Sequence, residues 1–412
     1  MTSNRRVAVV GAGVAGLTAI KSCLDEGLEP VCFELRSDIG GLWNYSDHCY
    51  PDDGARPYEC LITNTSKWTT PFSDFPFPED CPPLFSYGVF FSYLRNYANH
   101  FDVTKHIQFD TKVLSVSMAT DYDVTGRWIV ETENHESVRS DVFDYVMVCS
   151  GFCKTARMPK INGVEKFGGS SEHSQTYRSN LKYKNKSVLI IGNGNSAGDI
   201  AADISHVAKQ LGQNCCLWPF KRFTFLPLAN GRLRCYKMIF PLEHSHDTLA
   251  LIGSILKTVG PAPPVYELQA RFASRVFAGK HQLPARSKMA DEVDECNDMI
   301  IRKFGRYNYK FQNLEYRDQL AEELGIKPTF ADFLRNPKMA WTYYVDPAFP
   351  VHHRLVGAGA LTNAMSICDL ARKDTFAKQL RKLKSNNVSG SHIVVILFVL
   401  TLIVAVLFLR WI

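Results

Sequence analysis

The sequence is poor in cysteine and contains no recognisable metal-binding pattern. Its 412 residues include 12 cysteines, no two of which have the CxxC spacing, and only Cys215 and Cys216 are adjacent. This density is far below that of small disulfide-stabilised domains, and structural zinc sites usually need closely spaced cysteine or histidine ligands. We therefore expect a reducing compartment and no metal site.

The chain also lacks a strong excess of charge of one sign. The chain has 47 Lys and Arg residues against 41 Asp and Glu residues, a formal net charge of +6, and the positive side chains form no long stripe. Nucleic acid is therefore not an expected partner. Apolar residues make up 46% of the chain and aromatic residues 12%. This composition indicates a large folded core and, at this length, about two domains.

One long hydrophobic run is present, at residues 393–409, with Thr401 as its only polar member. As a helix it would span roughly 25 Å, close to the hydrocarbon thickness of a bilayer. Basic residues before it would keep the body of the protein in the cytosol: Lys378, Arg381, Lys382 and Lys384. We expect a basic linker at 371–391 and a C-terminal transmembrane helix at 392–412 that contacts lipid of the endoplasmic reticulum membrane. The mitochondrial outer membrane is a second address, and a soluble core helix is the alternative.

A glycine-rich turn lies near the N-terminus. Residues 6–10 form a β-branched run, GAGVAG follows at 11–16, and apolar residues then recur at helical spacing. In this strand–turn–helix order, Gly11 permits the turn, Gly13 lets the backbone approach a pyrophosphate, and Gly16 lets the helix pack closely on the strand. The pattern predicts a dinucleotide site; a glycine turn without a ligand is the alternative.

Two features after this turn favour FAD as the dinucleotide. A second strand, PVCFE, ends in Glu34, whose carboxylate would accept hydrogen bonds from a ribose and repel a 2′-phosphate, which favours FAD or NAD over NADP. The following GGLW would let the backbone pass close to a flat ring and resembles the GG motif of flavoproteins with two dinucleotides: Gly40, Gly41, Leu42 and Trp43. A Gly-Gly turn beside a core tryptophan is the alternative.

A second glycine fingerprint, similar to the one at 11–16, has the sequence GNGNSAGD at 192–199. It follows the apolar run 187–191 and precedes an expected helix at 200–211. Gly192 and Gly194 repeat the logic of the first site, and Ala197 replaces the third glycine. No acid occurs between residues 204 and 220, and Lys221 and Arg222 follow. This pattern favours the 2′-phosphate of NADPH, with solvated surface charges as the alternative. Two dinucleotide sites indicate an electron-transferring flavoprotein.

The segment between the fingerprints carries FxGxxxHxxxY at 167–177. Taken alone, His173 is interpreted as a packed or surface histidine. Together with the fingerprints, GGLW and the C-terminal apolar run, the pattern resembles the flavin-containing monooxygenases of the microsomal, animal type. The resemblance extends over further segments: NTSK at 64–67, SDFPFPED at 73–80, YANHFD at 97–102 and ELQAR at 267–271. It implies an α/β chain with two Rossmann-like domains, the second inserted in the first.

The resemblance also implies an activity and a set of site residues. Such an enzyme uses NADPH and O2 to oxygenate soft nucleophilic nitrogen or sulfur in small molecules through a C4a-hydroperoxyflavin, or in some members inserts oxygen beside a ketone. The implied FAD contacts are Gly11, Ala12, Gly13, Val14, Ala15, Gly16, Glu34, Gly40, Gly41, Leu42, Trp43, Thr63, Asn64 and Thr65. The implied NADP contacts are Gly192, Gly194, Asn195, Ser196, Ala197, Gly198 and Asp199.

Asn64 is the implied catalytic residue, because its amide can donate a hydrogen bond near the flavin without a carboxylate's charge. Without the resemblance, a turn asparagine would be the preferred interpretation.

The implied domains are a discontinuous FAD domain at 1–157 and 231–370 with an NADPH domain at 158–230 inserted between its halves. A doubly wound domain needs further strand–helix units of roughly thirty residues each, and they are missing after residue 212. We expect about one β–α–β unit there, with sheet edges left uncovered. Two hypotheses follow: an active monooxygenase, or a shortened, catalytically impaired, membrane-anchored FAD-binding relative that acts through partner association.

Overall fold

The computed structural model describes residues 5–48, 54–135, 137–151, 153, 155–156, 158–214, 234–253, 260–304 and 313–385. Its architecture is mixed α/β, as the sequence predicts. The chain divides into two units: the described parts of Met1–Lys67 with Pro78–Leu320, and those of Trp68–Phe77 with Ala321–Ile412. Each unit is described by itself below.

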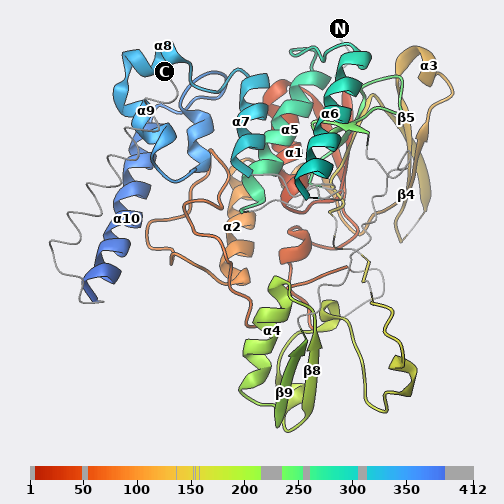
Figure 1. Cartoon of the computed structure of the whole chain (residues 1–412). Coiled ribbons are helices and arrows are strands. Elements are labelled where there is room, and N and C mark those ends of the chain that lie inside the picture. The colour runs from red at the N-terminus through yellow and green to blue at the C-terminus, as the bar shows by residue number, and fades with distance from the viewer. Residues whose placement is uncertain are drawn as a thin grey trace. The chain divides into compact units, whose positions relative to one another are not determined.

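A five-stranded parallel sheet forms the centre of the larger unit (Figure 1), with the order β12-β7-β1-β2-β3. Its strands are β1 (Arg6–Val10), β2 (Glu29–Phe33), β3 (Ile107–Gln108), β7 (Tyr145–Val148) and β12 (Leu249–Leu251). Helix α1 (Val14–Glu26) connects the parallel strands β1 and β2, the crossover that such a pair requires. The family resemblance implies a late strand of the FAD domain at 248–253, and β12 within this range joins the N-terminal strands in one sheet.

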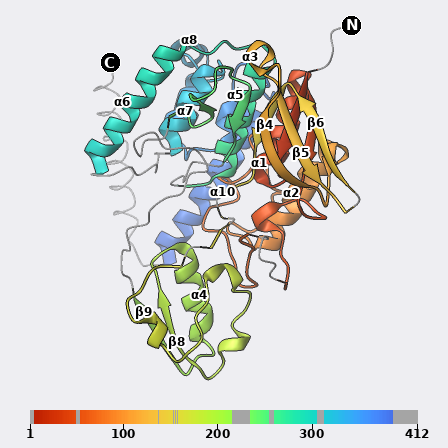
Figure 2. The ribbon, with the colours of Figure 1, turned by 90° about the vertical axis from the view of Figure 1, so that its right-hand side faces the viewer.

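Helices α1 and α5 (Pro263–Phe277) pack on each other against one face of this sheet (Figures 1 and 2). The sequence predicts a helix at 267–279, and the observed one begins a turn earlier because Pro263 fits the first helical position. Three residues are expected on its apolar face: Leu268 and Phe272 are buried, and Val276 is partly buried. Helix α6 (Arg286–Phe304) follows, and α7 (Asn313–Glu323) crosses from the larger unit into the smaller one.

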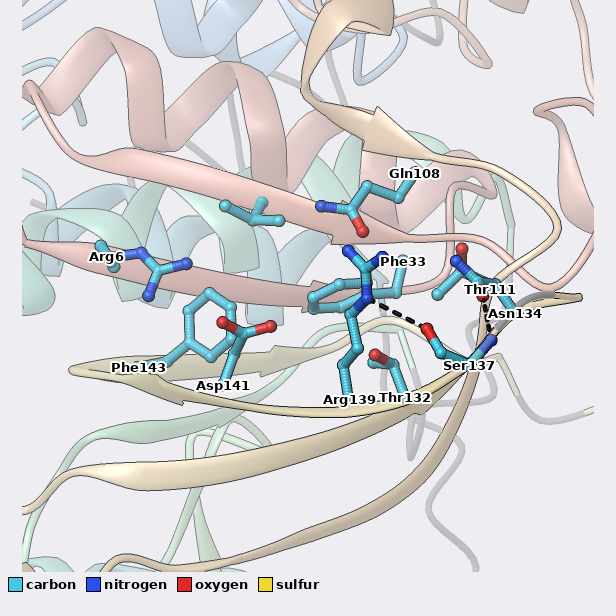
Figure 3. A pocket seen from close by; sticks show the side chains of 11 residues that line it. Arg6, Phe33, Gln108, Thr111, Thr132, Asn134, Ser137, Arg139, Asp141 and Phe143 are labelled. Carbon is cyan, nitrogen blue, oxygen red and sulfur yellow. Dashed lines mark hydrogen bonds between the residues drawn. The ribbon is translucent and has the colours of Figure 1, made fainter.

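A three-stranded antiparallel sheet packs against the parallel sheet: β4 (Lys112–Met118), β5 (Trp128–Glu133) and β6 (Val138–Phe143). A buried cluster joins the two sheets, including Phe33 and Val146 of the parallel sheet and Trp128 and Phe143 of the other. A polar cavity of about 250 Å³ lies beside this cluster, and Figure 3 shows side chains of both sheets directed into it. None of the site residues predicted from the sequence lines this cavity.

The second fingerprint forms a small β–α–β unit of β8 (Ser187–Ile191), α4 (Asn195–Ser205) and β9 (Gln210–Asn214). The helix expected to run to residue 211 ends at Ser205, so its predicted end was wrong. Residues 210–214 instead pair in parallel with β8, because Leu211 reaches the local apolar cluster as part of a strand. Within the described residues this sheet has two strands, and Leu189 and Ile191 of β8 remain 62% and 44% exposed.

The remaining elements of the larger unit are short or surround the sheets. They are α2 (Tyr87–His100), α3 (Tyr122–Thr125), β10 (Cys235–Tyr236), β11 (Phe240–Pro241) and the 3₁₀ turns η1 (Gly41–Trp43), η2 (Thr104–His106), η3 (Val164–Lys166), η4 (Ser174–Thr176) and η5 (Leu181–Tyr183). Helix α2 begins at Ser86, whose hydroxyl accepts a hydrogen bond from the Val89 amide and so caps the helix.

Helices dominate the smaller unit: α8 (Phe330–Arg335), α9 (Pro337–Tyr344), η6 (Pro350–Arg354) and α10 (Ala364–Ser385). Its core contains Trp68, Phe349 and Cys368, and the buried Arg354 guanidinium pairs with the buried Asp74 carboxylate at 2.8 Å. The expected basic linker at 371–391 is helical as far as Ser385. Within the described part of the chain, no helix is long and apolar enough to cross a membrane. The expected anchor at 392–412 lies outside the described residues.

Candidate functional site

The first glycine motif forms a tight turn between β1 and α1. Gly11 lies in the left-handed region with φ +99°, and a Cβ atom added to Gly16 would lie 1.8 Å from the Gly11 carbonyl oxygen. The fold therefore requires glycine at both positions. Gly13 differs, because its backbone is extended with φ −75° and a Cβ atom there would meet nothing closer than the Gly41 Cα at 3.6 Å. An alanine methyl group would therefore fit there in ordinary van der Waals contact with Gly41.

The Glu34 carboxylate is fixed beside this turn. Glu34 follows β2 and is only 6% exposed; its Oε2 accepts a hydrogen bond from the Ala12 amide at 2.6 Å, and its Oε1 accepts one from the Arg36 amide at 3.0 Å. Burial raises the pKa of Glu34, although both backbone hydrogen bonds act in the opposite direction. A carboxylate is thus held where the ribose of a bound dinucleotide would lie in a fingerprint of this kind.

The Gly-Gly motif lies against the fingerprint. The Gly40 amide donates to the Ala12 carbonyl at 3.0 Å, and a Cβ atom on Gly41 would approach the Gly13 Cα to 3.1 Å. The Arg36 guanidinium donates to the Gly41 carbonyl at 2.6 Å, which the sequence did not indicate. The two glycine motifs, separated in sequence, therefore form one backbone surface.

The other residues expected at the FAD site lie close in sequence to the two glycine motifs, within the larger unit. Leu42 is 41% exposed, and the Trp43 ring packs edge-on against Phe90 with 4.6 Å between centroids. Ala12, Val14 and Ala15 are buried in the turn and the first turn of α1.

The segment with Asn64 is held by its neighbour Thr63. Thr63 is buried; its amide donates to the Phe85 carbonyl at 2.8 Å, and its hydroxyl accepts from the Phe85 amide at 3.2 Å. Asn64, the next residue, is exposed, and Thr65 is partly buried. The hydrogen bonds of Thr63 thus fix the backbone directly before Asn64, whose side chain carries the amide.

The second glycine motif leaves the N-terminus of α4 open. Gly192 has φ +137°, whereas Gly194 and Gly198 have no heavy atom of the described residues within 4 Å of an added Cβ atom. Asn195 and Ser196 are exposed in the first turn, and Ala197 is partly buried. A helix N-terminus with exposed amides suits a phosphate. Lys221 and Arg222 lie outside the described residues.

Two tyrosines donate hydrogen bonds to the acidic residues of α4, contacts that the sequence did not indicate. The Tyr58 hydroxyl donates to the Asp199 carboxylate at 2.5 Å, and the Tyr177 hydroxyl donates to the Asp203 carboxylate. Burial first, and then the adjacent carboxylate, raises the pKa of each tyrosine. The available signal was the spacing of Asp199 and Asp203, two acids one turn apart beside the buried stripe of the helix.

His173 has a local structural role in the described residues. Its Nδ1 accepts a hydrogen bond from the Gln175 amide at 3.1 Å, at the start of η4. Burial lowers its pKa, which keeps the ring neutral and able to accept this bond.

The match to a protein-family model decides the membership of the chain. The model described as flavin-binding monooxygenase-like matches residues 4–223 and 212–411. The chain belongs to this family. Flavin-containing monooxygenase 5 of Cavia porcellus is 30% identical, over 93% of this chain and 95% of the relative. Flavin-containing monooxygenase 1 of Homo sapiens is 31% identical, over 86% and 90%.

Membership confirms the resemblance seen in the sequence and makes the chain a relative of flavin monooxygenase enzymes. Dimethylaniline monooxygenase (N-oxide-forming) 2 of Oryctolagus cuniculus is 30% identical and aligned over 535 positions, with 99% of each chain covered. Because this chain has only 412 residues, more than a hundred positions of that relative have no counterpart here. The chain is therefore shortened internally.

Solved structures share the fold. S-allyl-L-cysteine S-oxygenase from Allium sativum superposes with a TM-score of 0.70 at 24% identity, over 91% of this chain and 99% of that one. Tmm from Pelagibacter sp. strain HTCC7211 gives 0.62 at 21% identity, over 77% and 84%. These matches support the two-domain Rossmann-type architecture expected from the sequence.

Proposed function

We propose that the chain binds FAD at the first glycine motif and NADPH at the second, and uses both with O2 to oxygenate soft nucleophilic nitrogen or sulfur in small molecules. The observation that carries the proposal is the surface formed by Gly13 and Gly41 beside the fixed Glu34 carboxylate. The packing of the described chain does not require glycine at position 13, which supports the role of this glycine in letting a pyrophosphate approach the backbone.

The residues of the first motif fit FAD in three respects. Backbone amides at the start of α1 would bind the pyrophosphate, Glu34 would accept hydrogen bonds from the ribose, and the backbone at 40–43 would pass beside the ring system. When bound, the flavin supplies the redox chemistry by which electrons from NADPH reach O2.

Asn64 would contribute a neutral donor near the reacting ring. An amide can donate a hydrogen bond without placing a negative charge beside an electron-rich cofactor. The Thr63–Phe85 hydrogen bonds would keep the Asn64 backbone in place during the reaction. The remaining protein groups would mainly exclude water and orient the cofactors.

One spectroscopic experiment tests the proposed function. The full chain, purified in detergent, should carry yellow flavin that bleaches anaerobically with NADPH and regains its colour in air, with a sulfide converted to sulfoxide. Asn64→Ala should keep the flavin and its bleaching but divert reduced O2 to hydrogen peroxide. A folded preparation without flavin would refute the proposal.

A second function is favoured by the shortened nucleotide unit. The described part of this unit has a two-stranded sheet with exposed Leu189 and Ile191, and the two matched segments of the family model meet at 212–223. The alternative is a catalytically impaired FAD-binding relative that acts through partner association. Bound flavin that NADPH does not bleach would favour this alternative over the active enzyme.

We also propose that residues 392–412 anchor the chain in the endoplasmic reticulum membrane with its body in the cytosol. The support is the seventeen-residue apolar run at 393–409 with basic residues before it. The full chain should remain with membranes after alkaline carbonate washing, and a chain ending at residue 391 should be released. Retention of the shorter chain would contradict the anchor.

A further inference from the structure

Helix α4 carries two carboxylates that accept hydrogen bonds from other segments. Asp199 and Asp203 are four residues apart and lie on the same side of the helix, next to Ile200 and Ile204, which are buried. Like charges at this spacing destabilise a helix. Asp199 is exposed and Asp203 is partly buried beside an apolar cluster, and hydrogen-bond donors from other segments engage both carboxylates.

Those donors come from two segments outside the helix. Tyr58, only 5% exposed, donates to Asp199 at 2.5 Å from a position 141 residues earlier in the chain. Tyr177, 1% exposed, donates to Asp203, and the Asn180 amide donates to the same carboxylate at 2.8 Å. The Tyr58 and Tyr177 rings also contact each other edge-on, with 5.7 Å between centroids.

The two donor segments are joined to each other and to the segment with Asn64. The Glu59 amide donates to the Arg178 carbonyl at 2.8 Å, and the Leu61 amide donates to the Tyr58 carbonyl at 2.9 Å. Asn64 follows Tyr58 by six residues, and Ile62 bridges to Ser86 on the way. A displacement of α4 would therefore act on the backbone that carries Asn64.

We propose that Tyr58 and Tyr177 are positioning residues that fix α4 through Asp199 and Asp203, so that its N-terminus meets the nicotinamide dinucleotide in register with the segment of Asn64. This inference rests on the proposed NADPH site at α4. It gives Asp199 a role different from the direct phosphate contact that the motif implies, because its carboxylate is turned to Tyr58.

The test measures NADP⁺ binding to the FAD-loaded full chain by calorimetry, together with the rate of anaerobic flavin bleaching at saturating NADPH. Tyr58→Phe removes one hydroxyl and keeps the ring. Its matched control is Tyr183→Phe, because Tyr183 donates to Glu172 and, within the described residues, makes no hydrogen bond to α4. We expect Tyr58→Phe to raise the Kd for NADP⁺ about fivefold and the control to change it less than about twofold.

A second pair of variants separates the hydrogen bond from the charge. Asp199→Asn and Asp199→Ala both remove the negative charge, but only asparagine keeps an oxygen that accepts from Tyr58. We expect Asn to bind NADP⁺ more tightly than Ala by about threefold, and this difference to vanish when Tyr58→Phe is also present. A structural defect alone would lower the unfolding temperature without this dependence on Tyr58.

Failure of the positioning role and failure of the proposed function would give different results. Failure of the unaltered chain to bind NADP⁺ would overturn the NADPH site and the positioning role together. Binding by the unaltered chain with no change in Tyr58→Phe, or with equal losses in Tyr58→Phe and Tyr183→Phe, would overturn the positioning role alone.

Discussion

Replacement of Gly13 by alanine should leave the fold intact and weaken FAD binding strongly. Gly13 caps α1 with φ −75° and ψ −167°, an extended conformation open to any residue. The added Cβ atom would meet the Gly41 Cα at 3.6 Å, an ordinary van der Waals distance. The methyl group would instead occupy the space that we assign to the pyrophosphate.

The expected loss of stability differs sharply between Gly13→Ala and Gly16→Ala. Alanine is a poorer helix cap than glycine, so Gly13→Ala should cost the apoprotein about 1 kcal/mol. Gly16→Ala would place a Cβ atom 1.8 Å from the Gly11 carbonyl oxygen, so the backbone must move and the loss should be about 3 kcal/mol or more. In contrast, FAD affinity should fall about a hundredfold in Gly13→Ala.

Two measurements check this contrast: urea unfolding of the apoprotein, and FAD titration followed by quenching of flavin fluorescence. Gly88→Ala in α2 is the control, because its Cβ atom would meet only the Ser86 hydroxyl oxygen at 3.8 Å. That variant should keep both stability and FAD affinity. Unchanged FAD binding in a folded Gly13→Ala protein would refute the assignment of the pyrophosphate to this turn.

Three further predictions concern charged and titratable groups. Because burial raises the pKa of Glu34, the unaltered chain should lose stability relative to Glu34→Gln as the pH rises from about 4 to 7, measured by urea unfolding at each pH. Because burial lowers the pKa of His173, the unaltered chain should lose stability relative to His173→Asn as the pH falls below about 6.5, in the same assay. Arg354→Met should cost about 3 kcal/mol, since it leaves the Asp74 carboxylate buried beside no guanidinium. The control for this third prediction is Lys105→Met, at an exposed ion pair, which should change stability in the same urea assay by less than about 0.5 kcal/mol.

Local steric rules made the first motif predictable from the sequence. Gly11 and Gly16 were assigned to the turn and to close packing, and the positive φ of Gly11 and the 1.8 Å approach at Gly16 confirm both reasons. The strands around each motif were also predictable, because short β-branched runs end at glycine turns. Family membership followed from motif spacing, which depends on sequence alone.

Contacts between distant segments were not predictable in the same way. The antiparallel strand β4 shows exposed and partly buried residues with little alternation, so its pattern gives no clear strand signal. The hydrogen bond from Tyr58 to Asp199 joins residues 141 positions apart, and no local preference of either residue indicates it. The end of α4 at Ser205 likewise depends on the pairing of β9 with β8.

The structure shows which glycines of the two motifs the chain itself requires, and the motifs alone do not. At Gly16 the chain itself excludes a side chain, so this glycine gives no information about a ligand. At Gly194 and Gly198 an added Cβ atom would meet no described heavy atom within 4 Å apart from those of its chain neighbours and of the backbone of α4, and both have backbones that other residues adopt. Helix propensity would favour alanine over glycine at position 198, inside α4. The described chain therefore does not require a glycine at this exposed position, which lies in the first turns of α4, where we assign the nicotinamide dinucleotide.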